Sequence, residues 1–307
     1  MEDYPSTILE FENRFKDEKA CLEYLAHIRW RDGFCCPKCG HTRAWITKKG
    51  LYYCQVCNRQ TSVTAGTIFN DRRKPLMLWF RAIWYVVNQK TGVSALGLQR
   101  VLGLRSYRTA WTWLHKLRCA MVRPGRDRLS GTVEVDETYI GGKKPGKRGR
   151  GAEGKSLVVV AVEDKDDRFG RLRLTRVADA STKNLIPAVQ KTVKESSLVR
   201  TDGWKGYAQL CSKGYQHSVI RQGSSDIGDN LLPLTNRVAA LLKSWLQGTH
   251  QGAVQRSHLD YYLNEFTFRF NRRTSKSRGK LFYRLVQQAV IIPPIPGKNI
   301  RGGRQFS

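Results

Sequence analysis

The sequence predicts a multi-domain α/β protein, and three observations along the chain lead to this fold class. Two pairs of cysteines lie within the first sixty residues, helical patterns continue to about residue 125, and strands and helices then alternate to about residue 290. A length of 307 residues fits about two domains on a prior of ~150 residues each. We expect an N-terminal helix and metal-binding segment over 1–65, a helical segment over 66–125, a mixed α/β domain over 126–290 and a flexible tail over 291–307.

The charge balance indicates a polyanionic partner. The chain has 54 Lys and Arg residues against 25 Asp and Glu residues, a net charge of +29, and its 40% hydrophobic content is enough for buried cores. Such an excess of one sign destabilises a compact state through self-repulsion. Because arginine clusters recur beside aromatic residues, we expect a surface that binds nucleic acid. A solvated basic surface without a partner is the alternative.

No segment of the sequence is expected to enter a membrane. A span needs about 18 apolar residues, and the richest stretch, 75–87, is interrupted by Arg81. The N-terminus lacks the basic-then-apolar pattern of a signal peptide, so we expect a cytoplasmic protein. In that compartment the eight cysteines favour metal binding over disulfides.

After a helix expected over 16–30, four cysteines form the most specific motif of the N-terminal segment. Cys36 and Cys39 make one CxxC pair and Cys54 and Cys57 another, with fourteen residues between the pairs. Two thiolate pairs on tight turns close a tetrahedral Zn²⁺ site with bonds of about 2.3 Å. We expect a structural zinc ion that supplies most of the folding energy of this short segment. Redox or structural dithiols are the alternative.

The helical segment begins at Pro75, and the helix that follows is apolar on most sides and hence buried. Helices over 94–102 and 106–122, with Gly103 in the turn, have the proportions of a helix-turn-helix motif. An inward stripe is expected from Tyr107, Trp111, Leu114 and Met121. The opposite face, which can reach phosphates or base edges, carries Arg105, Arg108, Thr112, His115 and Lys116. A plain helical hairpin with a solvated basic face is the alternative.

After Pro124 and Gly125 the pattern changes to that of a mixed α/β domain. Strands are expected at 132–140, 156–163, 171–178, 198–200 and 216–221, and helices at 182–195, 204–212, 234–247 and 256–272. The order β-β-β-α-β-α-β-α is that of the RNase H-like fold. A glycine-rich basic loop, 141–155, follows the first strand, and its cations are Lys143, Lys144, Lys147, Arg148, Arg150 and Lys155.

Two aspartates are the candidate catalytic residues of this domain. On the first strand Val133 and Val135 face one side, so Glu134 and Asp136 face the other. Asp202 lies at the end of a later strand, where α/β sheets present their chemistry. Carboxylates on adjacent strands can hold two metal ions about 3.5–4 Å apart, and hard oxygen ligands suit Mg²⁺ or Mn²⁺. Either aspartate taken alone is more often a turn or cap residue.

The helix expected over 234–247 adds two polar side chains to this picture. Asn236 and Lys243 are seven residues apart on one face, with the small Ala240 between them. An amide oxygen can ligate a metal ion, and an ammonium group can hold a phosphate. An ordinary exposed helix face is an equally good interpretation of the pattern.

Six short stretches of the sequence carry a family resemblance. They are CPKC at 36–39, YCQVC at 53–57, VDETYIGG at 135–142, TDGW at 201–204, LLKSWLQGTH at 241–250 and YLNEFTFRFNRR at 262–273. Together they resemble the insertion-sequence transposases of the ISXO-like kind, over roughly residues 10–290.

This resemblance implies a zinc ribbon and a helix-turn-helix that bind the terminal inverted repeats of the element, followed by an RNase H-like nuclease domain. It implies that Asp136 and Asp202 bind the catalytic metal ions. The third catalytic position falls on Asn236 and the accompanying lysine on Lys243. Glu265, on the last helix of the domain, is an alternative third ligand.

The resemblance also implies a DNA transposase that acts on double-stranded DNA. Water attacks a phosphodiester at each transposon end, and the freed 3′-hydroxyl attacks target DNA. The basic loop and Arg269, Arg272 and Arg273 are expected to track the DNA backbone. Because two ends must be joined, we expect a homodimer or a larger assembly on DNA. A catalytically decayed or domesticated DNA-binding protein is the main alternative, and a structure-specific nuclease is a weaker one.

Overall fold

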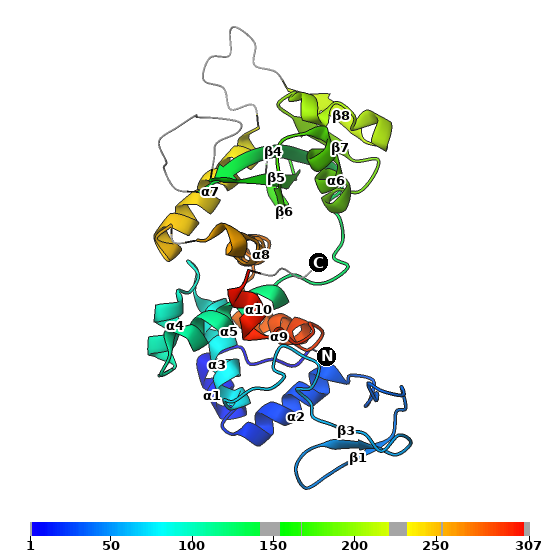
Figure 1. Cartoon of the computed structure of the whole chain (residues 1–307), viewed down its shortest axis with the longest axis vertical. Coiled ribbons are helices and arrows are strands. Elements are labelled where there is room, and N and C mark those ends of the chain that lie inside the picture. The colour runs from blue at the N-terminus through cyan, green and yellow to red at the C-terminus, as the bar shows by residue number, and fades with distance from the viewer. Residues whose placement is uncertain (1, 142–153, 167, 221–231, 253, 304–307) are drawn as a thin grey trace. The chain divides into compact units, whose positions relative to one another are not determined.

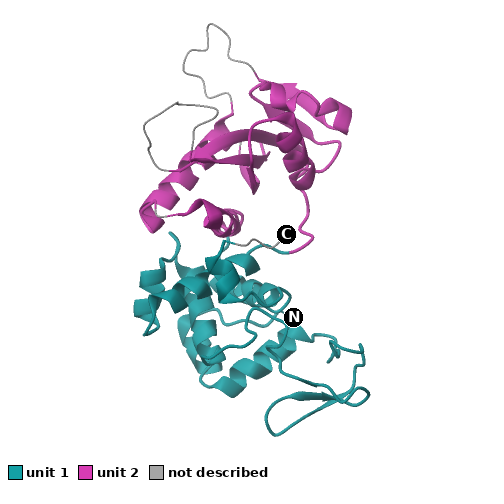
Figure 2. Cartoon of the chain, viewed as in Figure 1, with its two compact units in different colours: residues 1–123, 275–307 teal, residues 124–274 magenta. Residues whose placement is uncertain are grey.

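The computed structural model describes residues 2–141, 154–166, 168–220, 232–252 and 254–303. The chain divides into two units, residues 1–123 with 275–307 and residues 124–274, which Figure 2 shows in different colours. None of the helices in the described ranges is long and apolar enough to cross a bilayer.

The first unit combines a three-stranded sheet with helices from both ends of the chain. Its strands are β1 (Ala44–Ile46), β2 (Tyr52–Cys54) and β3 (Gln60–Thr61). Its helices are α1 (Ile8–Arg14), α2 (Glu18–Arg29), α3 (Leu76–Asn88), α4 (Ala95–Val101), α5 (Tyr107–Ala120), α9 (Arg278–Ala289) and α10 (Gly297–Arg301). At its core the rings of Phe11, Phe15 and Phe80 lie 5.4, 5.6 and 5.5 Å from that of Phe282. Aromatic rings at these distances add to the stability that their burial supplies.

The C-terminal segment differs from the sequence-based prediction. We expected the α/β domain to extend to residue 290 and a flexible tail to follow, whereas α9 packs against α2 and α3 of the first unit. The expectation of a flexible tail is wrong for residues 291–303, because Ile295 and Ile300 are buried and α10 packs against α5. The isoleucines of this proline- and glycine-rich segment form no repeat that indicates a helix, which is why the pattern did not reveal this packing.

Helices α4 and α5 form a short hairpin at the positions expected from the sequence. The hydroxyl of Ser94 accepts a hydrogen bond of 3.0 Å from the backbone N–H of Gly97 and so caps α4. In the turn between the helices Gly103 has a φ of +60°, which favours glycine.

The second unit contains a five-stranded sheet with the order β6-β5-β4-β7-β8 (Figure 1). Its strands are β4 (Thr132–Ile140), β5 (Ser156–Asp164), β6 (Phe169–Val177), β7 (Leu198–Thr201) and β8 (Gln216–Val219). The first three pair antiparallel, and β7 and β8 run parallel to β4. Its α-helices are α6 (Thr182–Thr192), α7 (Pro233–His250) and α8 (Leu259–Phe270). The five strands lie where the sequence predicted them.

One expected helix of this unit is not formed. Residues 204–212 contain only short 3₁₀ turns, Lys205–Tyr207 and Cys211–Lys213. Close packing fixes the first turn, because a Cβ atom on Gly206 would lie 2.7 Å from Leu185 Cδ1 and 2.8 Å from the carbonyl oxygen of Ala180.

Helices cover both faces of the five-stranded sheet. Helix α6 packs over the face that carries Val133 and Val135, and α7 and α8 pack over the face that carries Val158 and Val160. Since side chains alternate along a strand, Glu134 and Asp136 belong to the face covered by α7. The predicted sidedness of β4 is therefore confirmed by its packing.

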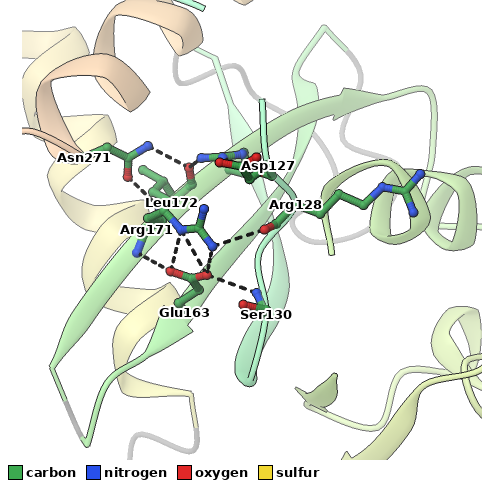
Figure 3. A network of polar contacts seen from close by, with 8 residues as sticks. Asp127, Arg128, Ser130, Glu163, Arg171, Leu172 and Asn271 are labelled. Carbon is green, nitrogen blue, oxygen red and sulfur yellow. Dashed lines mark hydrogen bonds and ion pairs between the residues drawn. The ribbon is translucent and has the colours of Figure 1, made fainter. Parts of the chain in front are cut away.

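A buried carboxylate joins β5 to the edge strand β6 and to the segment that leads into β4 (Figure 3). Glu163 accepts hydrogen bonds from the guanidinium of Arg171 at 2.6 and 2.9 Å and from the backbone N–H of Ser130 at 3.0 Å. Burial alone would raise the pKa of Glu163, but these hydrogen bonds outweigh it and hold the pKa below its ordinary value.

The exposed backbone of β6 is paired by a side chain rather than by another strand. The Asn271 amide accepts a 2.6 Å hydrogen bond from the N–H of Leu172 and donates a 3.1 Å bond to its carbonyl (Figure 3). Arg173 donates to the carbonyl of Asp127 at 2.7 Å. Asn271 therefore satisfies the backbone groups of Leu172 on the edge strand, where unpaired groups otherwise invite aggregation.

Replacing Ile300 by alanine should destabilise the first unit. The side chain of Ile300 is 0% exposed, and removing it leaves a cavity worth about 2–5 kcal/mol of unfolding free energy. Ile291 is 63% exposed, so Ile291→Ala is the matched control and should change stability by less than about 0.5 kcal/mol. Urea unfolding curves measure both, and equal effects would contradict the burial of the C-terminal segment.

The stability contributed by Glu163 should depend on pH. A carboxyl with a lowered folded-state pKa stabilises the fold above its ordinary value of 4.5, and this contribution is lost as the pH falls through the folded-state value. Glu163→Gln should therefore cost about 1.5–3 kcal/mol at neutral pH, and the difference should shrink in acid. Urea unfolding across the acid range tests this. Glu23→Gln is the control, since Glu23 is exposed and forms a 3.9 Å pair with Lys19, which contributes little.

Candidate metal centres and nucleic-acid interface

The four cysteines of the two CxxC pairs converge on one point. Their sulfur atoms all lie within 4.8 Å of one another, with 3.5 Å between Cys36 and Cys57 and 3.6 Å between Cys39 and Cys54. A tetrahedral zinc ion with bonds of about 2.3 Å holds its sulfur ligands about 3.8 Å apart. The four thiols are free of disulfides, and their spacing fits structural zinc.

The two CxxC turns share one hydrogen-bonding pattern, which explains the residues around them. The N–H of Gly40 donates to the carbonyl of Cys36 at 2.9 Å, and the N–H of Asn58 donates to that of Cys54 at 3.1 Å. Gly40 and Asn58 have φ angles of +73° and +58°, a region that glycine and asparagine tolerate best. The residue after each second cysteine is thus a sequence signal for the turn. Exposed Cys35 is not part of the cluster, as expected.

The two candidate aspartates lie on β4 and just after its parallel neighbour β7. In the parallel pair of β4 and β7, Thr132 lies beside Leu198 and Glu134 beside Arg200. Asp136 lies two residues further along β4, and Asp202 is the first residue after β7, two residues beyond Arg200. Neighbouring strands are about 4.8 Å apart, so this register is compatible with two carboxylates that bind the same metal ions.

Local hydrogen bonds hold each aspartate. One carboxylate oxygen of the half-buried Asp136 accepts from the N–H of Glu137 at 2.8 Å. The exposed Asp202 accepts from the N–H of Trp204 at 2.9 Å, which closes a tight turn after β7. This turn explains the Asp-Gly-Trp motif, because it holds the carboxylate of Asp202 at the end of the strand.

A buried tyrosine lies beside these carboxylates and was not identified from the sequence. The Tyr207 hydroxyl donates a 2.9 Å hydrogen bond to Glu137. Burial raises the pKa of Tyr207 well above its ordinary value, and the negative charges of Glu137, Asp136 and Asp202 raise it further. The phenol of Tyr207 therefore lies within the electrostatic field of all three carboxylates. The sequence did contain a signal for such a partner. Glu137 shares its strand face with the buried Val133 and Val135, so its carboxylate needs a hydrogen-bond donor there.

A second buried carboxylate fixes the helix that carries Asn236 and Lys243. Glu134 accepts hydrogen bonds from the N–H groups of Leu234 at 2.9 Å and Thr235 at 3.1 Å, in the first turn of α7. Burial raises the pKa of Glu134, which these two backbone donors partly oppose. Asn236 follows directly and is exposed, as is Lys243 two turns later.

Glu265 does not join the aspartates. In the described residues, the cysteine cluster is the one group of three or more His, Cys, Asp or Glu side chains spaced to hold a metal ion. Glu265 is buried and its carboxylate accepts hydrogen bonds from Arg269 at 2.7 and 2.9 Å. Glu265, the alternative third ligand, is therefore a partner of Arg269, which lies one helical turn away.

The arginines at the end of α8 also contact the protein itself, and their contact with the DNA backbone stays a prediction. The guanidinium of Arg269 pairs with Glu265. Arg272 lies 4.2 Å from the ring centre of Phe268, and Arg273 lies 4.4 Å from that of Phe270. Arg273 also donates to the carbonyl of Phe270 at 2.9 Å. These contacts support the packing of α8, and the sequence pattern did not distinguish them from free cations.

The face of α5 expected to meet DNA is only partly exposed. Arg105 and Arg108 are exposed, as predicted. Lys116 is turned inward, where its ammonium group donates to the carbonyl of Ile68 at 3.3 Å and burial lowers its pKa. His115 was also expected on this face and is buried, whereas Tyr107 of the predicted inward stripe is 53% exposed. Lys143, Lys144, Lys147, Arg148 and Arg150 lie outside the described residues.

Two domain families match the chain in the order in which the structure presents them. Residues 16–60 match the transposase zinc-ribbon domain, and residues 128–271 match the ISXO2-like transposase domain. The molecule is thus a transposase-type protein with an N-terminal metal ribbon, and these matches together cover more than half of its length. The chain belongs to the ISXO2-like insertion-sequence transposases.

A relative from Halobacterium salinarum supports the same placement. It is described as an uncharacterized protein in transposable element ISH50. The two sequences are 28% identical over 280 residues, which cover 83% of this chain and 91% of the relative. The similarity thus extends over both units.

Removing one cysteine of the cluster should abolish zinc binding and unfold the ribbon. Cys54→Ser deletes a buried ligand, and the small hydrophobic core around it cannot hold the turns without metal. Cys35→Ser, one residue before the cluster, should retain about one zinc ion per chain. Metal analysis and near-ultraviolet circular dichroism measure the difference. Full zinc content in Cys54→Ser would exclude Cys54 as a ligand.

Proposed function

We propose that this chain is a DNA transposase that binds transposon terminal inverted repeats, cleaves a strand at each end and transfers it into target DNA. The observation that supports this most directly is the parallel register of β4 and β7, in which Asp136 and Asp202 each follow two residues after the paired Glu134 and Arg200. Family membership supports the general activity, and the carboxylates supply the candidate reaction centre.

The architecture agrees with the proposed activity. Three antiparallel strands followed by two parallel ones, in the order β6-β5-β4-β7-β8, match what we expect of an RNase H-like nuclease. The hairpin of α4 and α5 has helix-turn-helix proportions, with exposed Arg105 and Arg108 beginning its second half. We assign this hairpin and the zinc ribbon to recognition of the transposon ends.

Each side chain then has a chemical task at the candidate centre. Asp136 and Asp202 offer hard oxygen ligands, and the amide oxygen of Asn236 offers a neutral one. When bound, Mg²⁺ or Mn²⁺ would lower the pKa of water and neutralise the charge that develops on a phosphodiester. The ammonium group of Lys243 neutralises a DNA phosphate. Glu134 positions Asn236 by holding the first turn of α7.

The proposed reaction proceeds without a covalent protein intermediate. Water attacks the phosphodiester at a transposon end, the bond to the 3′-oxygen breaks, and a 3′-hydroxyl is freed. That hydroxyl attacks a phosphodiester of target DNA, and the displaced target oxygen leaves. Every bond broken is replaced by one formed, so no oxidant, reductant or nucleotide cofactor is required.

Cleavage of labelled end DNA in Mg²⁺ or Mn²⁺ tests the proposal. Asp136→Asn and Asp202→Asn should each lower the cleavage rate by about a hundredfold or more, because a centre that stabilises developing charge is lost. Asp166→Asn removes the same charge from an exposed position after β5 and should not change the rate. Unchanged cleavage by Asp136→Asn would remove that residue from the centre. End binding without cleavage by the unaltered chain would favour a DNA-binding protein without chemistry.

Because two transposon ends must be brought together, we expect a homodimer or a larger complex on DNA. Mass measurement of the end-bound complex tests this expectation. A complex with one chain for each pair of ends would refute it.

A further inference from the structure

The outer face of the zinc ribbon carries an aromatic pair that the proposed chemistry does not use. Trp45 of β1 lies opposite Tyr53 of β2, with ring centres 5.0 Å apart and ring planes within 8° of parallel. On the inner face Ala44, Tyr52 and Cys54 pack around the cysteine cluster. Trp45 and Tyr53 therefore point away from the metal site, and Trp45 remains 55% exposed.

The strand order leaves one side of the tryptophan without a neighbouring strand. The sheet runs β1-β2-β3, so Tyr53 lies on the middle strand between Trp45 and Gln60, and Trp45 lies on an edge strand. Tyr53 covers one side of the indole, and the sheet has no further strand on the other. A flat ring can extend this stack at the β1 edge.

Charge identifies the kind of ring that would stack there. Residues 33–70 contain no Asp or Glu, and their five cations, all exposed, are Lys38, Arg43, Lys48, Lys49 and Arg59. Four thiolates with Zn²⁺ carry a charge of about −2, so the ribbon stays cationic with its metal bound. An aromatic platform on a cationic surface is the combination that binds bases of a nucleic acid strand.

We propose that the outer face of the zinc ribbon, formed by Arg43, Trp45, Tyr53 and Gln60, binds an unpaired DNA base that stacks on Trp45. In a duplex both faces of each base are covered by neighbouring bases, so the platform selects unpaired nucleotides. The inference rests on the proposed action on DNA, and it adds a single-stranded partner to the double-stranded one. A nicked or frayed transposon end would supply such nucleotides.

Fluorescence anisotropy with the zinc-loaded full chain tests this, using oligothymidylate and an abasic strand of equal length and charge. The unaltered protein should bind oligothymidylate more tightly than the abasic strand. Trp45→Ala should weaken oligothymidylate binding about 5- to 150-fold per stacked base and leave abasic binding unchanged. Trp45→Phe should retain most of the preference.

Ile46→Ala is the matched control, because Ile46 is the next residue, is 63% exposed and belongs to the other sheet face. It should leave the preference unchanged. Zinc content verifies that each variant keeps its ribbon. Equal binding of both strands by the unaltered protein, or a full preference in zinc-loaded Trp45→Ala, would overturn the proposal. Loss of self-association in Trp45→Ala with its base preference intact would identify a protein interface instead and would also overturn it.

Photocrosslinking tests the stacking site in the unaltered chain, so its result does not depend on the folding of a variant. Photocrosslinking with a bromouracil-substituted strand should label Trp45 in the unaltered chain, and crosslinks confined to residues outside 43–60 would contradict the stacking site. Cleavage of end DNA is scored separately. A chain that prefers bases but does not cleave refutes the proposed reaction alone, and a chain that cleaves without a base preference refutes the platform alone.

Discussion

The arrangement of the candidate centre depends on the buried carboxylate of Glu134. It joins the central strand to the first turn of α7 through two backbone N–H groups, over about a hundred residues of sequence. A helix N-terminus carries partial positive charge, so the contact is electrostatically favourable despite the burial of an acid. Asp136 shares the strand with Glu134, and Asn236 shares the helix turn with its partners. The Glu134 contact therefore connects the strand that carries Asp136 to the helix turn that carries Asn236.

The zinc ribbon also brings distant side chains together, although it has no large hydrophobic core. Its two turns place backbone groups, glycine and asparagine so that four thiols converge, and the metal replaces the hydrophobic burial that so few residues cannot supply. Because the cysteines occupy the inner face of the sheet, the outer face is free to carry exposed aromatic side chains at little cost to folding. In both units, interactions that fix the fold lie beside the surface that we propose to bind DNA.

Patterns that depend on neighbouring residues were predicted well from the sequence. Strand alternation gave the five strands and the sidedness of β4, and cysteine spacing gave the cluster. Contacts between distant segments were not accessible. Nothing near Lys116 indicates that the carbonyl of Ile68 would bind its ammonium group, and nothing near Ile300 indicates a buried site. Amphipathic periodicity shows which face of a helix is apolar, and it does not show which cations already have partners.

The same limit applies to the arginines of α8, because the sequence pattern did not reveal their contacts within the protein. Arg269, Arg272 and Arg273 neutralise or cover groups of their own unit. A net charge of +29 is therefore not a count of cations available to DNA. Cations that lie among no acids and have exposed side chains are the better guide, and residues 33–70 and the start of α5 meet that criterion. For this chain, the local imbalance of charge is a more specific basis than the total charge for proposing where nucleic acid binds.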